Sequence, residues 1–136
     1  MTHGNLDELP NLAAIHLNDT HPVLAIPEMM RVMLDECGYG WDAAWDIVKR
    51  TVAYTNHTVM SEALETWNRD LFKMRLPRIY QIVEEIDRRF WNEMRAKGVD
   101  EGKIFRMAPL KRRLCEDGQP GRHRLPLRQR RVRPPQ

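Results

Sequence analysis

Two short apolar runs, each followed directly by a group of polar residues, constrain the fold of this sequence most. The runs are residues 13–17 and 52–54. Runs this short fit buried strands, although five residues do not fix a period by themselves. Helical patterns lie between them and after them, and this order is typical of the α/β class. We therefore expect the α/β class, with helix in the majority.

The expected helices follow from turn residues and apolar spacing. Thr20 or His21 is expected near the cap of the first helix and Pro22 at its first position, with Gly38 ending it. Pro27 must then fall within the first turn or two. Three further helices are expected at residues 42–49, 70–76 and 77–98. Between the first two, a short helix is expected that Ser61 caps and that includes Leu64 and Trp67. On the last of these, Glu84–Arg88 and Glu85–Arg89 are expected ion pairs.

The net charge of +3 averages two unlike regions. Residues 1–110 carry a net charge of −4, whereas residues 111–136 carry +7, with eight arginines and four prolines. This composition predicts a lead-in loop at 1–12, a folded part at 13–98, a connecting segment at 99–110 and a disordered basic tail at 111–136.

Composition also argues against several classes of protein. No apolar run approaches the roughly 18 residues of a membrane span. The tail contains no aromatic residue on which a nucleic-acid base could stack. The histidines lack the spacing of a metal site, so we expect none. The two cysteines are far apart in sequence, which favours a reducing, cytoplasmic location.

The candidate site is formed by the polar residues that follow the two strands. Asn18, Asp19 and His21 follow the first strand, and His57 and Thr58 follow the second. Ligands of open α/β sheets gather beyond the carboxyl ends of the strands. Carboxylate, amide, hydroxyl and imidazole groups together suit a neutral polyhydroxyl ligand such as a sugar. The alternative is structural: Asp19 and Thr20 cap a helix, and His57 is a hydrogen-bonded turn residue.

Three stretches resemble the α-glucan phosphorylases, the family of glycogen, starch and maltodextrin phosphorylase. They are AIHLNDTHPVLAIPEMMRVMLDE from Ala14, WDAAWDIVKRTVAYTNHTVMSEALETW from Trp41 and LPRIYQIVEEIDRRF from Leu76. The resemblance runs without gaps from about Leu12 to Phe90. Because family members are several times longer, the resemblance implies a fragment from the later part of their N-terminal, Rossmann-like domain of the glycosyltransferase-B type. The expected structure is an incomplete α/β piece that is mostly helical and contains short parallel strands.

The resemblance implies a hexosyltransferase that phosphorolyses non-reducing α-1,4-glucan ends to glucose 1-phosphate with retained configuration. His57 would bind the terminal glucose, its backbone carbonyl facing the charge that develops on the sugar. The residues lining the same region would be Asn18, Asp19, His21, Thr58 and Glu65. The implied partners are glucan and phosphate, in a cytoplasmic homodimer.

The resemblance also implies the cofactor pyridoxal phosphate, whose lysine belongs to a domain absent from this sequence. The fragment is therefore expected to be inactive alone. Two other interpretations remain open. One is a free-standing module that binds sugar through residues 12–96 and an acidic partner through the tail. The other, weaker, is a nucleic-acid-binding protein.

The tail itself is the subject of a further hypothesis, a one-base frame slip between about Leu110 and Cys115. Back-translated and read one base later, the tail from Cys115 allows VKMANLAVTGCHSVNGVSALH, which is similar to the family's next segment. We predict that the coding DNA encodes this peptide in the shifted frame, and resequencing from the codon of Arg106 past that of Gln136 checks it. A shifted frame that encodes nothing similar would make the basic tail a genuine element of the protein.

Overall fold

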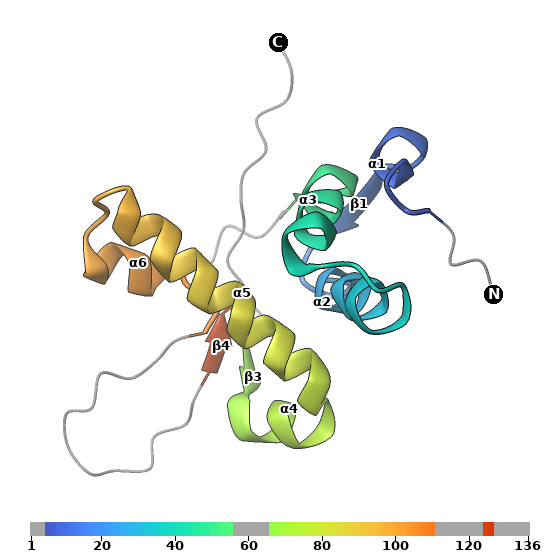
Figure 1. Cartoon of the computed structure of the whole chain (residues 1–136). Coiled ribbons are helices and arrows are strands. Elements are labelled where there is room, and N and C mark those ends of the chain that lie inside the picture. Colours follow the sequence, from blue (N-terminus) through green and yellow to red (C-terminus); the bar gives the residue numbers. More distant parts are fainter. Residues whose placement is uncertain (1–4, 56–65, 111–123, 127–136) are drawn as a thin grey trace. The chain divides into compact units, whose positions relative to one another are not determined.

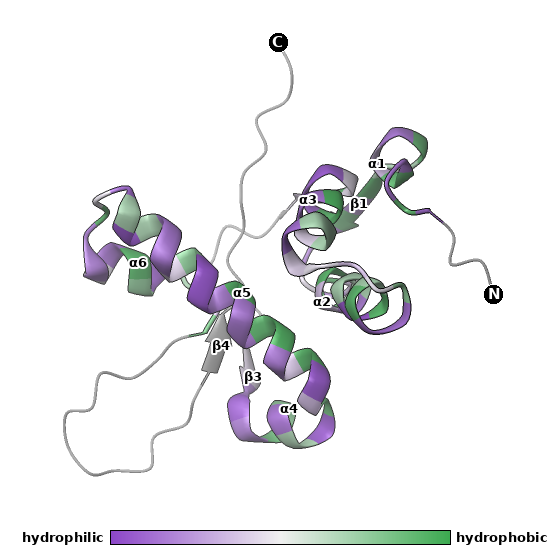
Figure 2. Ribbon diagram, in the orientation of Figure 1, coloured by the Kyte–Doolittle hydropathy of each residue, from purple (hydrophilic) through white to green (hydrophobic). Residues whose placement is uncertain are grey.

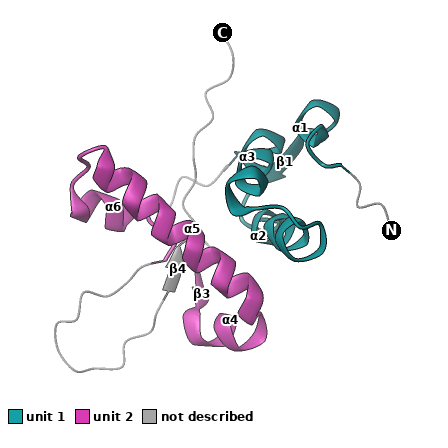
Figure 3. Cartoon of the chain, viewed as in Figure 1, with its two compact units in different colours: residues 1–59, 129–136 teal, residues 60–128 magenta. Residues whose placement is uncertain are grey.

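The computed structural model describes residues 5–55, 66–110 and 124–126. The chain divides into two compact units, coloured separately in Figure 3: residues 1–59 with 129–136, and residues 60–128. The elements of unit 1, in chain order, are α1 (Leu9–Leu12), β1 (Ile15–Asn18), α2 (Ala25–Arg31), the π-helix η1 (Val32–Glu36), α3 (Trp41–Thr51) and β2 (Val52–Thr55). Those of unit 2 are β3 (Thr66–Asn68), α4 (Arg69–Arg75), α5 (Pro77–Ala96), α6 (Glu101–Met107) and β4 (Arg124–Pro126), as labelled in Figure 1.

Strands β1 and β2 form a two-stranded parallel sheet in unit 1. Ile15 is paired with Val52, and the register continues to Asn18 opposite Thr55. Helices α2 and α3 lie between the two strands in sequence, as a parallel connection requires. This arrangement confirms the predicted class, a mostly helical α/β piece with short parallel strands. None of the helices among the described residues is long and apolar enough to cross a membrane.

Helix α2 starts later than the sequence indicated. It begins at Ala25 with Leu24 as its N-cap, so neither Thr20 nor His21 caps it and Pro22 does not open it. The reason is a preceding turn, in which the N–H of Val23 donates to the carbonyl of Thr20 and the N–H of Ala25 to that of Pro22. Pro27 does fall in the first turn, where a missing N–H costs nothing.

The core of unit 1 comes from one face of α3 and from the methionines of α2 and η1. Ala44, Ile47 and Val48 of α3 are buried at helical spacing, together with Met30 and Met33. After η1 the chain turns at Gly38, whose φ of +72° lies in the left-handed region that favours glycine.

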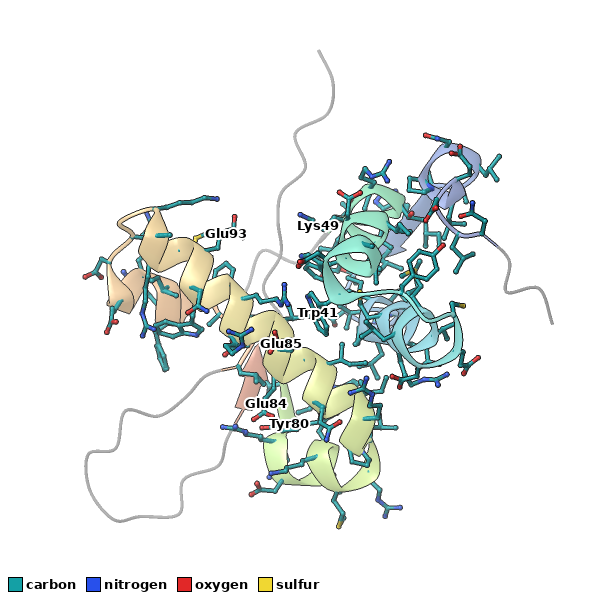
Figure 4. The ribbon with its side chains drawn as sticks, viewed as in Figure 1. Trp41, Lys49, Tyr80, Glu84, Glu85 and Glu93 are labelled. Atoms are coloured by element: carbon teal, nitrogen blue, oxygen red, sulfur yellow. The ribbon has the colours of Figure 1, made fainter. Side chains whose placement is uncertain are left out.

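Unit 2 is organised around α5, on which hydrophobic and hydrophilic residues alternate (Figure 2). An aromatic series packs on it, with ring centroids 5.4 Å apart for Trp67 and Phe72 and 6.2 Å apart for Phe72 and Tyr80. The Nε of Arg69 donates to the Tyr80 hydroxyl, and its guanidinium lies 3.6 Å from Glu84. Tyr80 and Glu84 are labelled on α5 in Figure 4.

The ion pairs on α5 differ in part from the predicted ones. Glu85 accepts hydrogen bonds from Arg88 and from Arg89, so the predicted Glu85–Arg89 pair is confirmed. The predicted Glu84–Arg88 pair is wrong, because Arg69 of α4 approaches Glu84 and Arg88 bonds Glu85 instead. The hydrogen bond from Arg88, and next that from Arg89, lowers the pKa of Glu85 to about 2.

Three elements of unit 2 depart from the sequence-based expectation. Trp67 lies in strand β3 and not in a helix capped by Ser61, and Ser61 itself lies outside the described residues. The expected connector at 99–110 contains helix α6, which Asp100 caps by accepting from the N–H of Lys103. Within the tail, β4 pairs antiparallel with β3, Trp67 lying opposite Leu125. Strand pairing uses only backbone groups, so a strand can form in the tail although its sequence has no apolar period from which the strand could be predicted.

A buried carboxylate fixes the chain after α6. Asp87 of α5 is fully buried, and its Oδ1 accepts a hydrogen bond of 3.0 Å from the backbone N–H of Leu110. Leu110 is itself 1% exposed, and Ile104 and Ala108 are buried beside this return of the chain. The native packing of unit 2 therefore extends at least to Leu110, the residue at which the hypothetical frame slip begins.

We predict that Asp87→Ala destabilises unit 2, because the buried N–H of Leu110 loses its acceptor. The expected loss in the free energy of unfolding is about 1–3 kcal/mol. Hydrogen exchange at the Leu110 amide and urea unfolding measure it. Gln81→Ala, on the exposed side of the same helix, is the matched control and should change neither. Equal effects of the two substitutions would contradict a specific role of the Asp87 carboxylate.

Candidate functional site

The polar segments that follow β1 and β2 meet at one edge of the parallel sheet. Asn18 is the last residue of β1 and lies in register with Thr55, the last residue of β2. One residue further along, the backbone N–H of Asp19 donates to the carbonyl of Thr55 at 2.9 Å. The carboxyl ends of both strands therefore lie side by side, where ligands of α/β sheets bind. We call Asn18, Asp19, Tyr54 and Thr55 the strand-end site.

Asp19 has an unusual backbone conformation. Its φ is +59°, and it is the only non-glycine residue with a positive φ in the described part of the chain. Aspartate tolerates this left-handed conformation better than most residues, but it still costs free energy. The conformation ends β1 and turns the chain toward α2 while the N–H of Asp19 stays bonded to β2. Asp19 itself is half-buried.

Tyr54 adds a hydroxyl to the same place. Its hydroxyl oxygen is buried and has no hydrogen-bond partner among the described residues. Burial, and next the negative charge of Asp19, raise the pKa of Tyr54. The phenol therefore stays protonated and can donate a hydrogen bond. The strand-end site thus combines a donor hydroxyl, an amide and a carboxylate, which are the groups that neutral sugars accept and donate to.

The structure describes only half of the predicted site residues. Asn18 and Asp19 lie at the edge of the sheet, and His21 follows them as an exposed residue of the turn before α2. His57, Thr58 and Glu65 lie outside the described residues. Because Thr55 belongs to the strand-end site, the chain enters the segment of His57 directly from it.

The alternative that Asp19 and Thr20 cap the following helix is wrong for α2. The N-cap of α2 is Leu24, and no side chain forms a cap hydrogen bond there. Thr20 is buried, and its carbonyl accepts from the N–H of Val23 within the turn. His57, the other residue of this structural alternative, lies outside the described residues.

Sequence reasoning missed two contributors to this edge. His16 of β1 lies with its Nε2 atom 2.5 Å from the Oγ1 atom of Thr55. Tyr54 was expected only as the end of the second apolar run, and its buried hydroxyl had no signal in the sequence. Strand register decides both contacts, and a parallel register cannot be read from two short apolar runs. Among the described residues, no three histidine, cysteine, aspartate or glutamate side chains gather to hold a metal ion.

Comparison with known proteins assigns the fold to a family. The sequence model of the carbohydrate phosphorylases matches residues 1–116. The chain belongs to the carbohydrate phosphorylase family. The match covers all of unit 1 up to β2 and the helices of unit 2, so the strand-end site lies within the family region.

Individual members of this family are similar over most of the chain. α-Glucan phosphorylase 2 (cytosolic) of Arabidopsis thaliana is 53% identical over 104 residues, 76% of this chain and 12% of that protein. Glycogen phosphorylase of Bacillus subtilis is 55% identical over 89 residues, 65% of this chain and 11% of that protein. The muscle glycogen phosphorylase of Homo sapiens is 54% identical over 92 residues, 68% of this chain and 11% of that protein. The chain therefore spans about an eighth of the length of such relatives.

We predict that Asp19→Asn lowers the pKa of Tyr54, because it removes the negative charge next to the phenol. The pKa should remain above its ordinary value of about 10, since burial still opposes ionisation. NMR titration of the tyrosine ring carbons measures it. Above about pH 10, Tyr54 ionises in the unfolded chain before it ionises in the folded chain, so the free energy of unfolding of unit 1 falls as the pH rises further. Asp46→Asn, an exposed site on α3, is the control, and an equal shift there would contradict the coupling.

Proposed function

We propose that this chain contributes the glucan-binding edge of an α-glucan phosphorylase, which transfers a terminal α-1,4-linked glucose to phosphate. The observation that carries the proposal is the strand-end site, where the backbone N–H of Asp19 bonds the carbonyl of Thr55, so that the ends of both strands lie at one edge of the sheet. Family membership supports the reaction class, and the names of the relatives support the substrate. Glucan and phosphate are the proposed partners, in a cytoplasmic homodimer.

The site residues have separate proposed roles. Asp19 accepts hydrogen bonds from sugar hydroxyls, Asn18 provides an amide, and Tyr54 provides a donor. His57 binds the glucose at the non-reducing end, with its carbonyl facing the charge that develops at the sugar carbon. The roles of His21, Thr58 and Glu65 are to line the same pocket.

The residues present do not fit the family's cofactor. Pyridoxal phosphate needs a lysine for its Schiff base and cationic groups for its phosphate. The segments that form this edge, residues 15–21 and 52–55, contain no lysine or arginine and bring the carboxylate of Asp19. We therefore propose that the cofactor binds to parts of an intact enzyme outside this chain, and that this chain alone does not phosphorolyse glucan.

A graft tests the proposed reaction. Residues 12–90 replace the matching segment of the Bacillus subtilis glycogen phosphorylase, which is 55% identical to the chain over the 89 residues that align. We expect the graft to release glucose 1-phosphate from maltoheptaose and phosphate, and the 136-residue chain to release none. In the graft, Asp19→Asn should lower kcat/KM by about 10–100-fold, the usual effect of losing a charged hydrogen bond. Asp46→Asn, the same substitution on the exposed face of α3, should leave kcat/KM unchanged.

Two outcomes would overturn the proposal. One is a graft that folds and takes up its cofactor but releases no glucose 1-phosphate. The other is a chain that binds maltoheptaose tightly by itself and unfolds cooperatively, which would favour the free-standing sugar-binding module. If an acidic partner bound to the chain and dissociated when salt was added, this would further favour a binding role for the tail.

A further inference from the structure

Thr55, the last residue of β2, is held at two points by the neighbouring strand. Its carbonyl accepts the N–H of Asp19 at 2.9 Å. Its Oγ1 atom lies 2.5 Å from the Nε2 atom of His16, within hydrogen-bond distance. One contact uses the backbone and the other the side chain, so both the position and the orientation of Thr55 are fixed. We call this set, His16, the Asp19 N–H and Thr55, the Thr55 clamp.

The clamp lies at the point where both polar segments leave the sheet. On one side it ends at Asp19, whose left-handed backbone turns the chain away from β1. On the other side it ends at Thr55, and the chain continues directly into Asn56 and His57. A shift of Thr55 would therefore move the end of β2 relative to Asp19 at the end of β1.

The side chains of the clamp contribute little to the core. His16 is exposed and Thr55 is half-buried, whereas the core of unit 1 comes from residues such as Leu17, Met30 and Ile47. Thr51 differs from Thr55, because it is buried and its hydroxyl donates to the carbonyl of Ile47 within its own helix, α3. Removing the His16–Thr55 contact should thus leave the fold intact and change only the geometry at the strand ends.

We propose that His16 and Thr55 are positioning residues of the glucan site, and that they act by holding the end of β2 at Thr55 in register with Asn18 and Asp19 at the end of β1. The inference rests on the proposed function for its consequence in catalysis. The structural part, that the clamp fixes the strand ends relative to one another, is independent of it. Neither side chain touches substrate in this proposal.

The first test uses the full 136-residue chain and hydrogen exchange followed by NMR. Thr55→Val and His16→Ala remove the side-chain contact, and Thr55→Ser and His16→Gln keep a hydrogen-bonding group. We expect the Asp19 amide to exchange about fivefold faster in the first pair, the equilibrium effect of one net hydrogen bond. The amide resonances of Asn56 and His57 should shift with it. The second pair should resemble the unsubstituted chain.

A control and a contrary result complete this test. Lys49→Gln, on the exposed side of α3 and labelled in Figure 4, should change neither the exchange rate nor the resonances. Unchanged exchange of the Asp19 amide in Thr55→Val would overturn the clamp. So would equal effects of Thr55→Val and Thr55→Ser, since these would indicate packing and not a hydrogen bond.

The second test separates this inference from the proposed function. In the graft described above, Thr55→Val should raise KM for maltoheptaose about fivefold and leave KM for phosphate unchanged, with recovery in Thr55→Ser. An active graft whose kinetics do not respond to Thr55→Val would overturn the positioning role alone. An inactive graft would count against the proposed function, and the exchange measurement would still decide the clamp.

Discussion

The parallel pairing of β1 with β2 is the interaction on which the rest of this structure depends. It brings together two polar segments that are separated in sequence by about 35 residues, and it does so through backbone hydrogen bonds that require no particular side chain. The connection through α2, η1 and α3 supplies the apolar face that holds the strands in place, with Met30, Ala44 and Val48 fully or nearly fully buried. Because both strands run the same way, their polar ends fall at the same edge, and Asp19 can bond directly to Thr55.

Electrostatics at this edge follow from the same pairing. Tyr54 and Asp19 leave adjacent strands at nearly the same level, so the carboxylate raises the pKa of the phenol beyond the effect of burial. The result is a protonated donor beside an ionised acceptor. Such a pair recognises hydroxyl groups, which can both donate and accept, better than it recognises an anion. In unit 2 the charges have another role: Arg69 and Glu84 lie around the Tyr80 ring and join α4 to α5.

Sequence patterns predicted the elements better than their ends and contacts. The apolar runs and the spacing of residues 77–96 identified β1, β2 and α5, because these follow the periods of buried surfaces. The start of α2 was missed because a hydrogen-bonded turn competes with the helix for the N–H groups after Thr20. Helix α6 was missed because it is short and its cap, Asp100, resembles any polar turn residue. For the site, sequence identified Asn18 and Asp19, whereas His16 and Tyr54 depend on register, which propensity does not encode.

Most of strand β1 is exposed to solvent, which is unusual for a strand in a parallel sheet. Three of its four residues are exposed and Leu17 alone is buried, and Ile15 is 37% exposed. Parallel strands normally occur in sheets that helices cover on both faces, and an exposed pair of them is rare. The chain spans about an eighth of the length of the relatives that it matches. If other elements covered both faces of this strand pair, the dielectric constant around the strand ends would fall, and the hydrogen bonds of His16, Asp19 and Thr55 would each become stronger. The geometry at this edge is therefore already present in two strands, while its full energetic value depends on what covers them.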